Sequence, residues 1–507
     1  MSLWRKKSIT KLLADAETNS EHGLKKTLSA PSLVALGIGA IIGAGLFVRT
    51  AAAAGEHAGN AVTLSFIVAA VGCLFAGLCY AEFASMIPIA GSAYTYAYTT
   101  MGELIAWIIG WALVLEYALG AATVSIAWSE YINNLFGGAI PYQWCHSPFE
   151  TSPTGVSGLI NLPALFILLV LSLLLIRGTS ESAKVNAVIV FVKVSIVLIF
   201  VAIGWHFMKA ANHTPYFIPA DQKPVLDASG KVIYDYSPTE NHGFWGIMRG
   251  AAVVFFAFIG FDAVSTAAQE TKNPKRDMPI GILGSLAICT FLYILFSYVL
   301  TGVAPFTDFV KASAGKEASI SYAIKTYMTG FEWLAPLITI AILAGFSSVI
   351  LVMLLGQSRV FYSMSNDGLL PKAFSDLHPK FRTPYKSNLI LFLFVGLFAA
   401  FVPGSVAGDL TSIGTLLAFV LVCIGIMILR KKDPDRPRPF RAPFVPLFPI
   451  LGVIVCGAMI GSLGASTLIT AFGWMIFGLA IYFLYSRRHS NLHTHHLDEI
   501  PPPKDNI

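Results

Sequence analysis

The sequence predicts an all-α protein that crosses a membrane many times. Of its 507 residues, 55% are hydrophobic and only 12% are charged, whereas a soluble domain carries about 25% charged residues. The mean hydropathy is +0.69. The apolar stretches are continuous and about 20 residues long, which is the length that a helix needs to cross a bilayer. The strands of a membrane β-barrel would instead show short segments of alternating polarity.

Twelve stretches qualify as membrane spans, which places both termini on the same side. The candidate spans are residues 31–54, 62–86, 100–130, 161–177, 184–208, 244–268, 280–303, 333–358, 387–403, 409–429, 444–464 and 467–486. With the amino terminus inside, most of the 34 Lys and Arg residues fall in the predicted inner segments, as the positive-inside rule requires. We therefore expect a plasma (inner) membrane protein with cytoplasmic termini.

The net charge of +6 follows from this topology. Membrane lipid is an expected partner, and nucleic acid is not, because the basic residues flank spans and do not gather in a separate domain. The six cysteines lack the spacing of a metal site or of a disulfide framework. No metal or cofactor is expected.

The spans divide the chain into six segments. They are a cytoplasmic amino-terminal segment (1–30), a first set of five spans (31–208), an extracellular loop (209–243), a second set of five spans (244–429), a basic loop with two further spans (430–487) and a tail expected to be disordered (488–507).

The first span contains four glycines within nine positions, in the run LGIGAIIGAGLF that ends at Phe47. Each glycine weakens a helix by up to ~1 kcal/mol relative to alanine. One interpretation is a discontinuous helix, whose freed amides bind an anion and whose freed carbonyls bind a cation. The other is close packing against neighbouring helices through small residues. The run is not a dinucleotide-binding fingerprint, because no strand precedes it.

The sixth span carries a second interruption, at Gly260 in the aromatic run FFAFIGFDAVSTAAQE. Two interrupted spans that are five spans apart are typical of an inverted repeat of five plus five helices. Such a pair predicts a binding site near the middle of the membrane, between the two halves. The two sequences show no visible match, so position and interruption alone support this repeat.

Lys193 lies about halfway along the apolar stretch 183–205, where a charge is costly. At this depth the side chain does not reach the membrane surface easily. Its ammonium group needs a partner, a water-filled cavity or the loss of its proton. A functional role is the main hypothesis, and a buried ion pair is the alternative.

Several further motifs follow the first span in a fixed order. They are the FIGFD run, QETKNPKRDMPIGI, SRVFYSMSNDGLLP and RPRPFRAPFVPLFP. Together with the glycine run they resemble the amino acid–polyamine–organocation (APC) superfamily, and more closely its cationic amino-acid transporter branch and related bacterial permeases. The resemblance covers residues 24–487. It implies a LeuT-like fold of five plus five spans with two accessory helices, and transport of an amino acid.

The resemblance also implies that backbone groups at the two interruptions bind the amino and carboxyl groups of an L-amino acid. It places the substrate carboxylate at the amides of Gly43, Ala44 and Gly45 and the substrate ammonium at the carbonyls of Ile41, Phe256, Ala257 and Ile259. A half-helix amino terminus has free N–H groups and a partial positive charge, so the first placement agrees with helix electrostatics.

Side chains near this site are expected to choose the substrate. The resemblance implies that the Phe256 ring caps the bound amino acid and that Met353 forms the pocket wall. A bulky, apolar methionine favours a small neutral amino acid such as alanine, although a methionine also adapts its shape. Glu116 is expected beside the pocket, where it binds a cationic side chain or carries a proton. Glu116 and Asp262 are each candidates for a second proton site or for a pair within the protein, and for Asp262 a structural role is preferred.

Lys193 matches a lysine of proton-coupled relatives that replaces a sodium ion between spans 1 and 8. Of the two candidate hydroxyl partners, Ser347 is preferred to Ser348. The resemblance thus implies a symporter with the proton as coupling ion. Glu82 and Glu270 are expected to form gate ion pairs.

Two other functions remain open for a transporter-like chain. One is an exchanger of cationic amino acids or of an amino acid for a polyamine, and the other is an amino-acid sensor without net transport. An enzyme is not expected, because the sequence has no HExxH, GxSxG or nucleotide-binding motif.

Overall fold

The computed structural model describes residues 4–10, 12, 26–43, 45–152, 155–219, 225–226, 230, 232–234, 243–309, 319–463 and 465–494. Within these ranges the protein is helical, apart from the antiparallel hairpin of β1 (Val225–Leu226) and β2 (Val232–Tyr234) and short connections. The predicted all-α fold class is confirmed.

The helices follow the chain in this order. The α-helices are α2 (Ala30–Ile41), α3 (Thr50–Ala53), α4 (Val62–Met86), α5 (Ala93–Thr100), α6 (Glu103–Val114), α7 (Gly120–Leu135), α8 (Leu162–Arg177), α9 (Thr179–Phe207), α10 (Gly243–Val254), α11 (Ala263–Thr266), α12 (Pro274–Val303), α14 (Ser319–Tyr327), α15 (Leu334–Asn366), α16 (Tyr385–Phe401), α17 (Gly404–Lys432), α18 (Leu447–Ser462), α19 (Ala465–Ile481), α20 (Arg487–His489) and α21 (Asn491–Thr494).

Short π-helical and 3₁₀-helical segments, labelled η, interrupt or extend these helices. They are η1 (Gly45–Arg49), η2 (Ala54–Ala58), η3 (Gly59–Ala61), η4 (Leu115–Leu119), η5 (Tyr142–Trp144), η6 (Ala210–His213), η7 (Phe255–Phe258), η8 (Ala268–Glu270), η9 (Lys372–Phe374) and η10 (Tyr482–Ser486).

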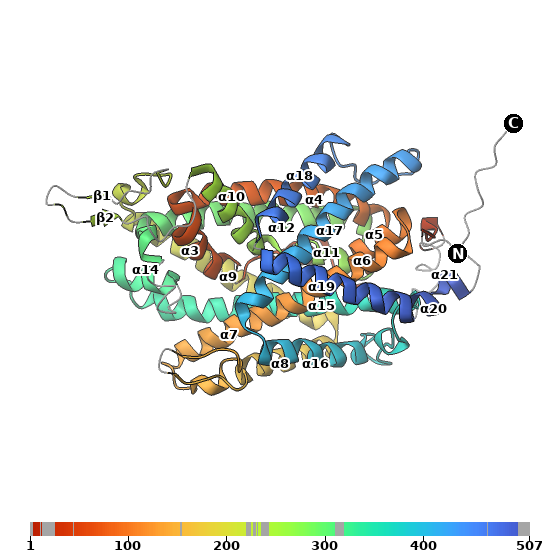
Figure 1. Ribbon diagram of the computed structural model, residues 1–507, viewed down its shortest axis with the longest axis horizontal. Coiled ribbons are helices and arrows are strands. Elements are labelled where there is room, and N and C mark those ends of the chain that lie inside the picture. Colours follow the sequence, from red (N-terminus) through yellow and green to blue (C-terminus); the bar gives the residue numbers. More distant parts are fainter. Residues whose placement is uncertain are drawn as a thin grey trace.

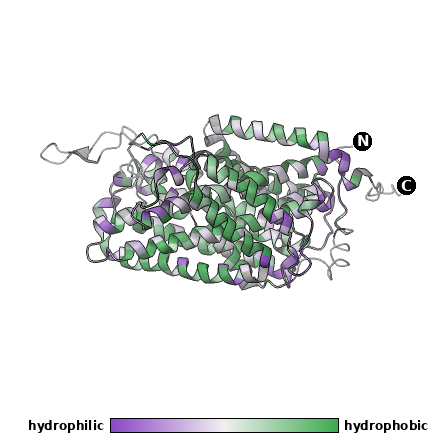
Figure 2. Ribbon diagram, turned by 90° about the horizontal axis from the view of Figure 1, so that it is seen from below, coloured by the Kyte–Doolittle hydropathy of each residue, from purple (hydrophilic) through white to green (hydrophobic). Residues whose placement is uncertain are grey.

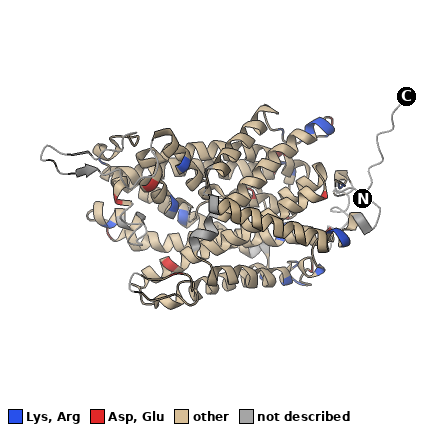
Figure 3. Ribbon diagram, in the orientation of Figure 1, with Lys and Arg blue, Asp and Glu red and all other residues tan. Residues whose placement is uncertain are grey.

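The long helices run roughly along the longest axis of the molecule (Figure 1). Hydrophobic residues dominate the middle of this bundle, and hydrophilic residues gather at its two ends (Figure 2). The β1–β2 hairpin lies at one end, which we call the hairpin end, and α20 lies at the other, the α20 end. Lys and Arg residues, coloured blue, occur toward both ends of the bundle (Figure 3).

Eight helical stretches within the described residues are long and apolar enough to cross a membrane. The shorter apolar helices α2, α8, α16 and α18 accompany them. Every predicted span contains helix, although α9 begins before the expected residue 184 and α15 continues past residue 358. This composition fits a polytopic membrane protein. The twelve crossings and the inverted repeat stay predictions.

The predicted interruption of the first span is present. Helix α2 ends at Ile41, and Ile42 adopts an extended conformation with ψ of 103° before η1 begins at Gly45. A Cβ atom at Gly45 would lie 2.2 Å from Cα of Ala257. The glycine is therefore required for the contact between this break and η7, so the close-packing interpretation holds together with the discontinuous one.

The interruption of the sixth span is also present. Helix α10 ends at Val254, η7 adds one turn, and Ile259 is extended with ψ of 133°. Gly260 has φ of +111°, a region that favours glycine because a Cβ atom is strained there. A Cβ atom at this position would also meet Cβ of Ala40 at 2.7 Å. The two breaks thus lie against each other in the middle of the bundle.

Candidate functional site

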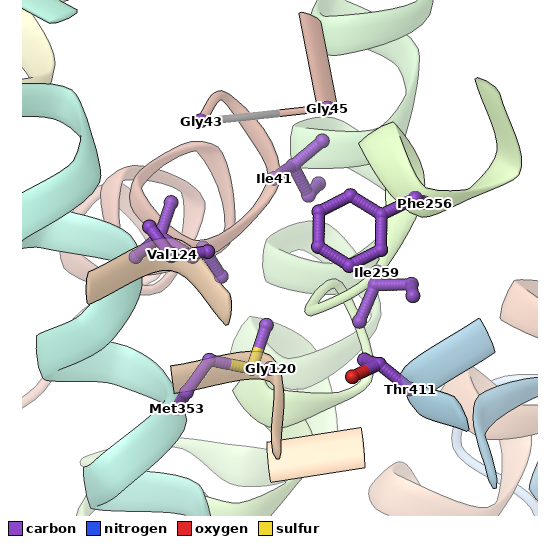
Figure 4. Close-up of a pocket in the computed structure, with 11 residues that line it drawn as sticks. Ile41, Gly43, Gly45, Gly120, Val124, Phe256, Ile259, Met353 and Thr411 are labelled. Atoms are coloured by element: carbon purple, nitrogen blue, oxygen red, sulfur yellow. The ribbon is translucent and has the colours of Figure 1, made fainter. Parts of the chain in front are cut away.

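A pocket lies between the two interrupted helices. It is lined by Ala40, Ile41, Gly43, Gly45, Gly120, Val124, Phe256, Ile259, Val349, Met353 and Thr411 (Figure 4). The structure thus brings together six residues predicted to bind substrate, namely Ile41, Gly43, Gly45, Phe256, Ile259 and Met353. The predicted Ala44 lies outside the described residues.

Tyr293 of α12 connects the two breaks, and sequence reasoning missed it. Its hydroxyl lies 2.8 Å from the carbonyl oxygen of Ile41 and 2.8 Å from that of Ala257. A tyrosine hydroxyl has one proton to donate, so the two carbonyls share it. These are two of the carbonyls predicted to receive the substrate ammonium. The only sequence signal was a hydroxyl within an apolar span.

The walls of the pocket are mainly apolar. Val124, Ile259 and Met353 line the space, and Thr411 adds a hydroxyl (Figure 4). Val349 is a further lining residue. Such a surface contributes dispersion and area burial and has no charge to match a cationic side chain.

Gly120 keeps this space open beside Met353. A Cβ atom added at Gly120 would lie 3.4 Å from Cγ2 of Thr411 and 3.8 Å from Sδ of Met353. Both distances are ordinary van der Waals contacts, so an alanine would fit and would fill part of the pocket. Gly120 was not predicted as a lining residue, because its position depends on the packing of α7 against α15.

The ring of Phe256 borders the pocket and is 8% exposed. In Figure 4 it lies between Ile41 and Ile259. The guanidinium group of Arg49, at the end of η1, lies 5.6 Å from the centre of this ring. A cation and the face of an aromatic ring attract each other, so Arg49 helps to hold the ring of Phe256 in place.

Lys193 is fully buried in α9, and its ammonium group lies at the first break. Nζ donates hydrogen bonds to the carbonyl oxygens of Gly39, at 2.8 Å, and of Ile42, at 2.7 Å. The last carbonyls of a helix lack partners within the helix and carry partial negative charge. The amino-terminal half of the broken span therefore supplies the counter-charge, through its backbone.

Ser348 is the hydroxyl next to Lys193, at 3.5 Å from Nζ. It donates to the carbonyl of Gly39, at 3.0 Å, and lies 2.6 Å from Oδ1 of Asn186, whose amide bonds the carbonyl of Ala35. The preferred Ser347 instead donates to Leu343 within its own helix, at 2.9 Å. Consecutive helical residues point about 100° apart, so one of the two serines faces α2 and the other does not. The placement of Ser347 beside Lys193 was wrong.

Glu116 is buried in η4 and is not among the residues that line the pocket. Its predicted role in substrate binding stays a prediction. Its carboxyl group lies near that of Asp262, which receives a hydrogen bond from the hydroxyl of Tyr117. Gly120, one turn after Glu116, does line the pocket.

The two predicted ion pairs are present. Glu270 binds Arg359 at 2.6 Å, with both side chains buried. Glu82 binds Arg430 at 2.6 Å and lies 3.2 Å from Arg438. The first pair joins η8 to α15, and the second joins α4 to the end of α17. Their role as gates stays a prediction.

Comparisons with known proteins identify the family of this chain. The family model described as amino acid permease matches residues 28–490. The chain is 44% identical to the branched-chain amino acid permease BcaP of Bacillus subtilis (strain 168), over 97% of this chain and 99% of that protein. It is 39% identical to the methylthioribose transporter of the same organism, over 97% and 99%.

A plant relative gives the same family. The chain is 35% identical to the vacuolar cationic amino acid transporter 4 of Arabidopsis thaliana, over 83% of this chain and 66% of that protein. Two facing helix breaks, a pocket between them and this match over most of the sequence lead to one conclusion. The chain is an integral membrane protein that belongs to the amino acid permease family of the APC superfamily, and it is a transporter rather than an enzyme.

Proposed function

We propose that this protein imports a neutral aliphatic L-amino acid together with a proton. The observation that carries the proposal is the position of Lys193, whose ammonium group holds the carbonyls of Gly39 and Ile42 at the edge of the pocket. A titratable cation in contact with the binding site gives a direct means of coupling a proton to the substrate.

The coupling follows from what the proton does for this contact. Protonated Lys193 has three N–H donors and a full positive charge, and both favour the carbonyl oxygens at the end of α2. Loss of the proton removes the charge and one donor, so the contact between α9 and the first break weakens. Ile41 and Gly43 line the pocket, so the same change alters the site that holds the substrate.

The substrate class follows from the pocket walls. Backbone groups at the breaks suit the ammonium and carboxylate that all amino acids share, and the apolar walls suit an aliphatic side chain. Alanine fits this description, as do the larger branched-chain amino acids that the name of the 44% identical relative gives. Met353 occupies the wall where a long cationic side chain would extend.

The transport cycle would alternate access to this pocket from the two ends of the bundle. Spans 1, 2, 6 and 7 would move as one unit against the remaining spans, which is the usual motion of inverted-repeat transporters. The pairs Glu270–Arg359 and Glu82–Arg430 would close the α20 end, which we propose is cytoplasmic in a plasma membrane.

An exchanger of cationic amino acids is the second candidate. Two observations favour it, namely the buried carboxyl group of Glu116 near the pocket and the 35% identity to a cationic amino acid transporter. The apolar lining argues against it, because a guanidinium or ammonium group there would lose its hydration without compensation.

The test is uptake of labelled L-alanine and L-leucine into proteoliposomes with and without an inward proton gradient. Unlabelled L-arginine and methylthioribose serve as competitors. Accumulation that the gradient drives and that neither competitor reduces supports the proposal. Uptake that does not depend on the proton gradient and that increases with the amino-acid concentration inside the proteoliposomes would favour the exchanger. Competition by methylthioribose would contradict an amino-acid substrate.

A further inference from the structure

Two carboxyl groups lie close together inside the bundle, behind the pocket. Glu116 belongs to η4, and Asp262 directly precedes α11, at the second break. Both side chains are fully buried, and their charges interact. The hydroxyl of Tyr117 donates to Oδ2 of Asp262. The pair therefore joins the third span to the interrupted sixth span.

The pair has too few hydrogen-bond donors if both groups are carboxylates. Among the residues that the structure describes, neither oxygen of Glu116 has a hydrogen-bond partner, and Oδ1 of Asp262 has none. Within the described parts of the chain, no lysine, arginine or histidine forms an ion pair with either group. Two unpaired negative charges at such depth are strongly unfavourable, because low dielectric surroundings strengthen their repulsion.

The other groups that face the two carboxyl groups cannot supply a positive counter-charge. They are Tyr117 of η4, Tyr80 and Cys73 of α4, Tyr96 of α5 and Thr415 of α17. The hydroxyl of Tyr80 is buried and, among the described residues, has no hydrogen-bond partner, whereas that of Tyr96 interacts with Ser265. All five are neutral side chains, and none is a cation.

We propose that Glu116 and Asp262 form a second proton-binding site, in which one proton is shared between the two carboxyl groups at neutral pH. A single proton removes one of the two charges and supplies the missing donor, so that one group donates to the other. This is the arrangement that paired acids adopt in other proteins when both cannot ionise. The site belongs to the pair, and neither residue holds the proton alone.

The shared proton would also connect parts that move. Asp262 follows the break that borders the pocket, and Glu116 lies one helical turn from Gly120 in the pocket wall. With the proton, the two carboxyl groups attract each other, and without it they repel. This consequence rests on the proposed transport function, since it adds a second proton-dependent contact to that of Lys193.

The proton itself can be detected by infrared spectroscopy, without any transport. The difference spectrum obtained by subtracting the Glu116→Gln variant from the wild-type protein at pH 7 should show the carbonyl band of a protonated carboxylic acid. The band should be absent from the difference between wild type and Asp435→Asn, which changes an exposed acid in the basic loop. Tyr117→Phe should keep the band, because it removes a donor from the ionised form only. A difference spectrum for Glu116→Gln without the band would overturn the proposal.

The connection to movement is tested by substrate exchange with equal pH on both sides of the membrane. The Lys193→Ala background removes the other titrating group. Exchange in this background should fall by about tenfold per pH unit above its midpoint, as the loss of one proton requires. Adding Glu116→Gln should make it independent of pH, because glutamine donates permanently to Asp262. A pH dependence that survives Glu116→Gln would contradict the moving contact.

The outcomes separate this proposal from the proposed function. If uptake ignores the proton gradient while the infrared band behaves as expected, symport fails and the shared proton stands. If Lys193 proves necessary for gradient-driven uptake while the infrared band is missing, symport stands and the shared proton of Glu116 and Asp262 fails. Exposed Asp435 serves as the control in both measurements.

Discussion

Lys193 illustrates how a single residue can impose a functional requirement on a membrane protein. Its ammonium group is removed from water, which costs several kcal/mol unless other groups replace the hydration. Here backbone carbonyls of Gly39 and Ile42, together with Ser348, replace it. These carbonyls are available only because α2 ends beside them. The residue and the helix break therefore depend on each other.

We predict that Lys193→Ala abolishes gradient-driven uptake and leaves exchange of substrate. The variant removes the titrating cation, and Lys193 itself is not among the residues that line the pocket. The matched control is Lys184→Ala, an exposed lysine on the same helix, which should accumulate substrate like the wild type. Both are compared in proteoliposomes with an imposed proton gradient. Full accumulation by Lys193→Ala would refute the coupling role.

We predict that Met353→Ser allows arginine to bind and to be transported. Serine removes most of the side chain from the pocket wall and leaves room for a guanidinium group and water. Competition by arginine against labelled alanine measures the effect, and inhibition should increase at least about tenfold, equivalent to ~1.4 kcal/mol of binding. Met353→Leu keeps the volume and should still exclude arginine. Continued exclusion by the serine variant would show that another residue sets selectivity.

At the scale of helices, the two breaks must touch for the site to exist. Gly45 and Gly260 allow the backbones of the first and sixth spans to approach, and Tyr293 bonds a carbonyl from each. The glycines were visible in the sequence, whereas Tyr293 could not be distinguished from other aromatic residues in a chain with 18 tyrosines. Its role depends on where α12 packs.

We predict that Gly45→Ala disrupts substrate binding. The new Cβ atom would lie 2.2 Å from Cα of Ala257, a backbone atom that cannot turn away, and overpacking of this kind costs ~1–3 kcal/mol. Gly473→Ala in α19 is the control, because its Cβ atom meets nothing within 4 Å. Affinity for alanine, measured by isothermal titration, should fall about tenfold or more in the first variant. Equal affinities in both variants would contradict the prediction.

At the scale of the whole molecule, buried ion pairs fasten the α20 end of the bundle. Glu270 binds Arg359 through its side chain, while its carbonyl accepts hydrogen bonds from the amides of Thr27 and Leu28. The segment before α2, the end of the sixth span and α15 thus meet at one residue. The prediction that Glu270 and Glu82 are paired was correct, although no sequence pattern identified Arg359 or Arg438 as a partner.

We predict that Glu270→Gln lowers the free energy of unfolding by about 3–5 kcal/mol, because the buried Arg359 would lose its ion pair with Glu270. All six cysteines are buried and free, so a thiol-reactive fluorophore reports unfolding during a thermal ramp. Lys386→Ala, which breaks the exposed pair with Asp376, should leave the midpoint unchanged. A Glu270→Gln protein as stable as wild type would mean that water or another group compensates Arg359.

Much of the molecule follows from the sequence by itself. The spans are apolar over membrane length, the glycines at 43, 45 and 260 mark both breaks, and Lys193 stands out because a charge in an apolar stretch needs a reason. Local composition determines these features. Tertiary structure alone decided that Ser348 and not Ser347 meets Lys193, that Glu116 lies near Asp262, and that Tyr293 joins the breaks. Each depends on helix rotation and on contacts between residues far apart in the chain, which the order of amino acids does not express locally.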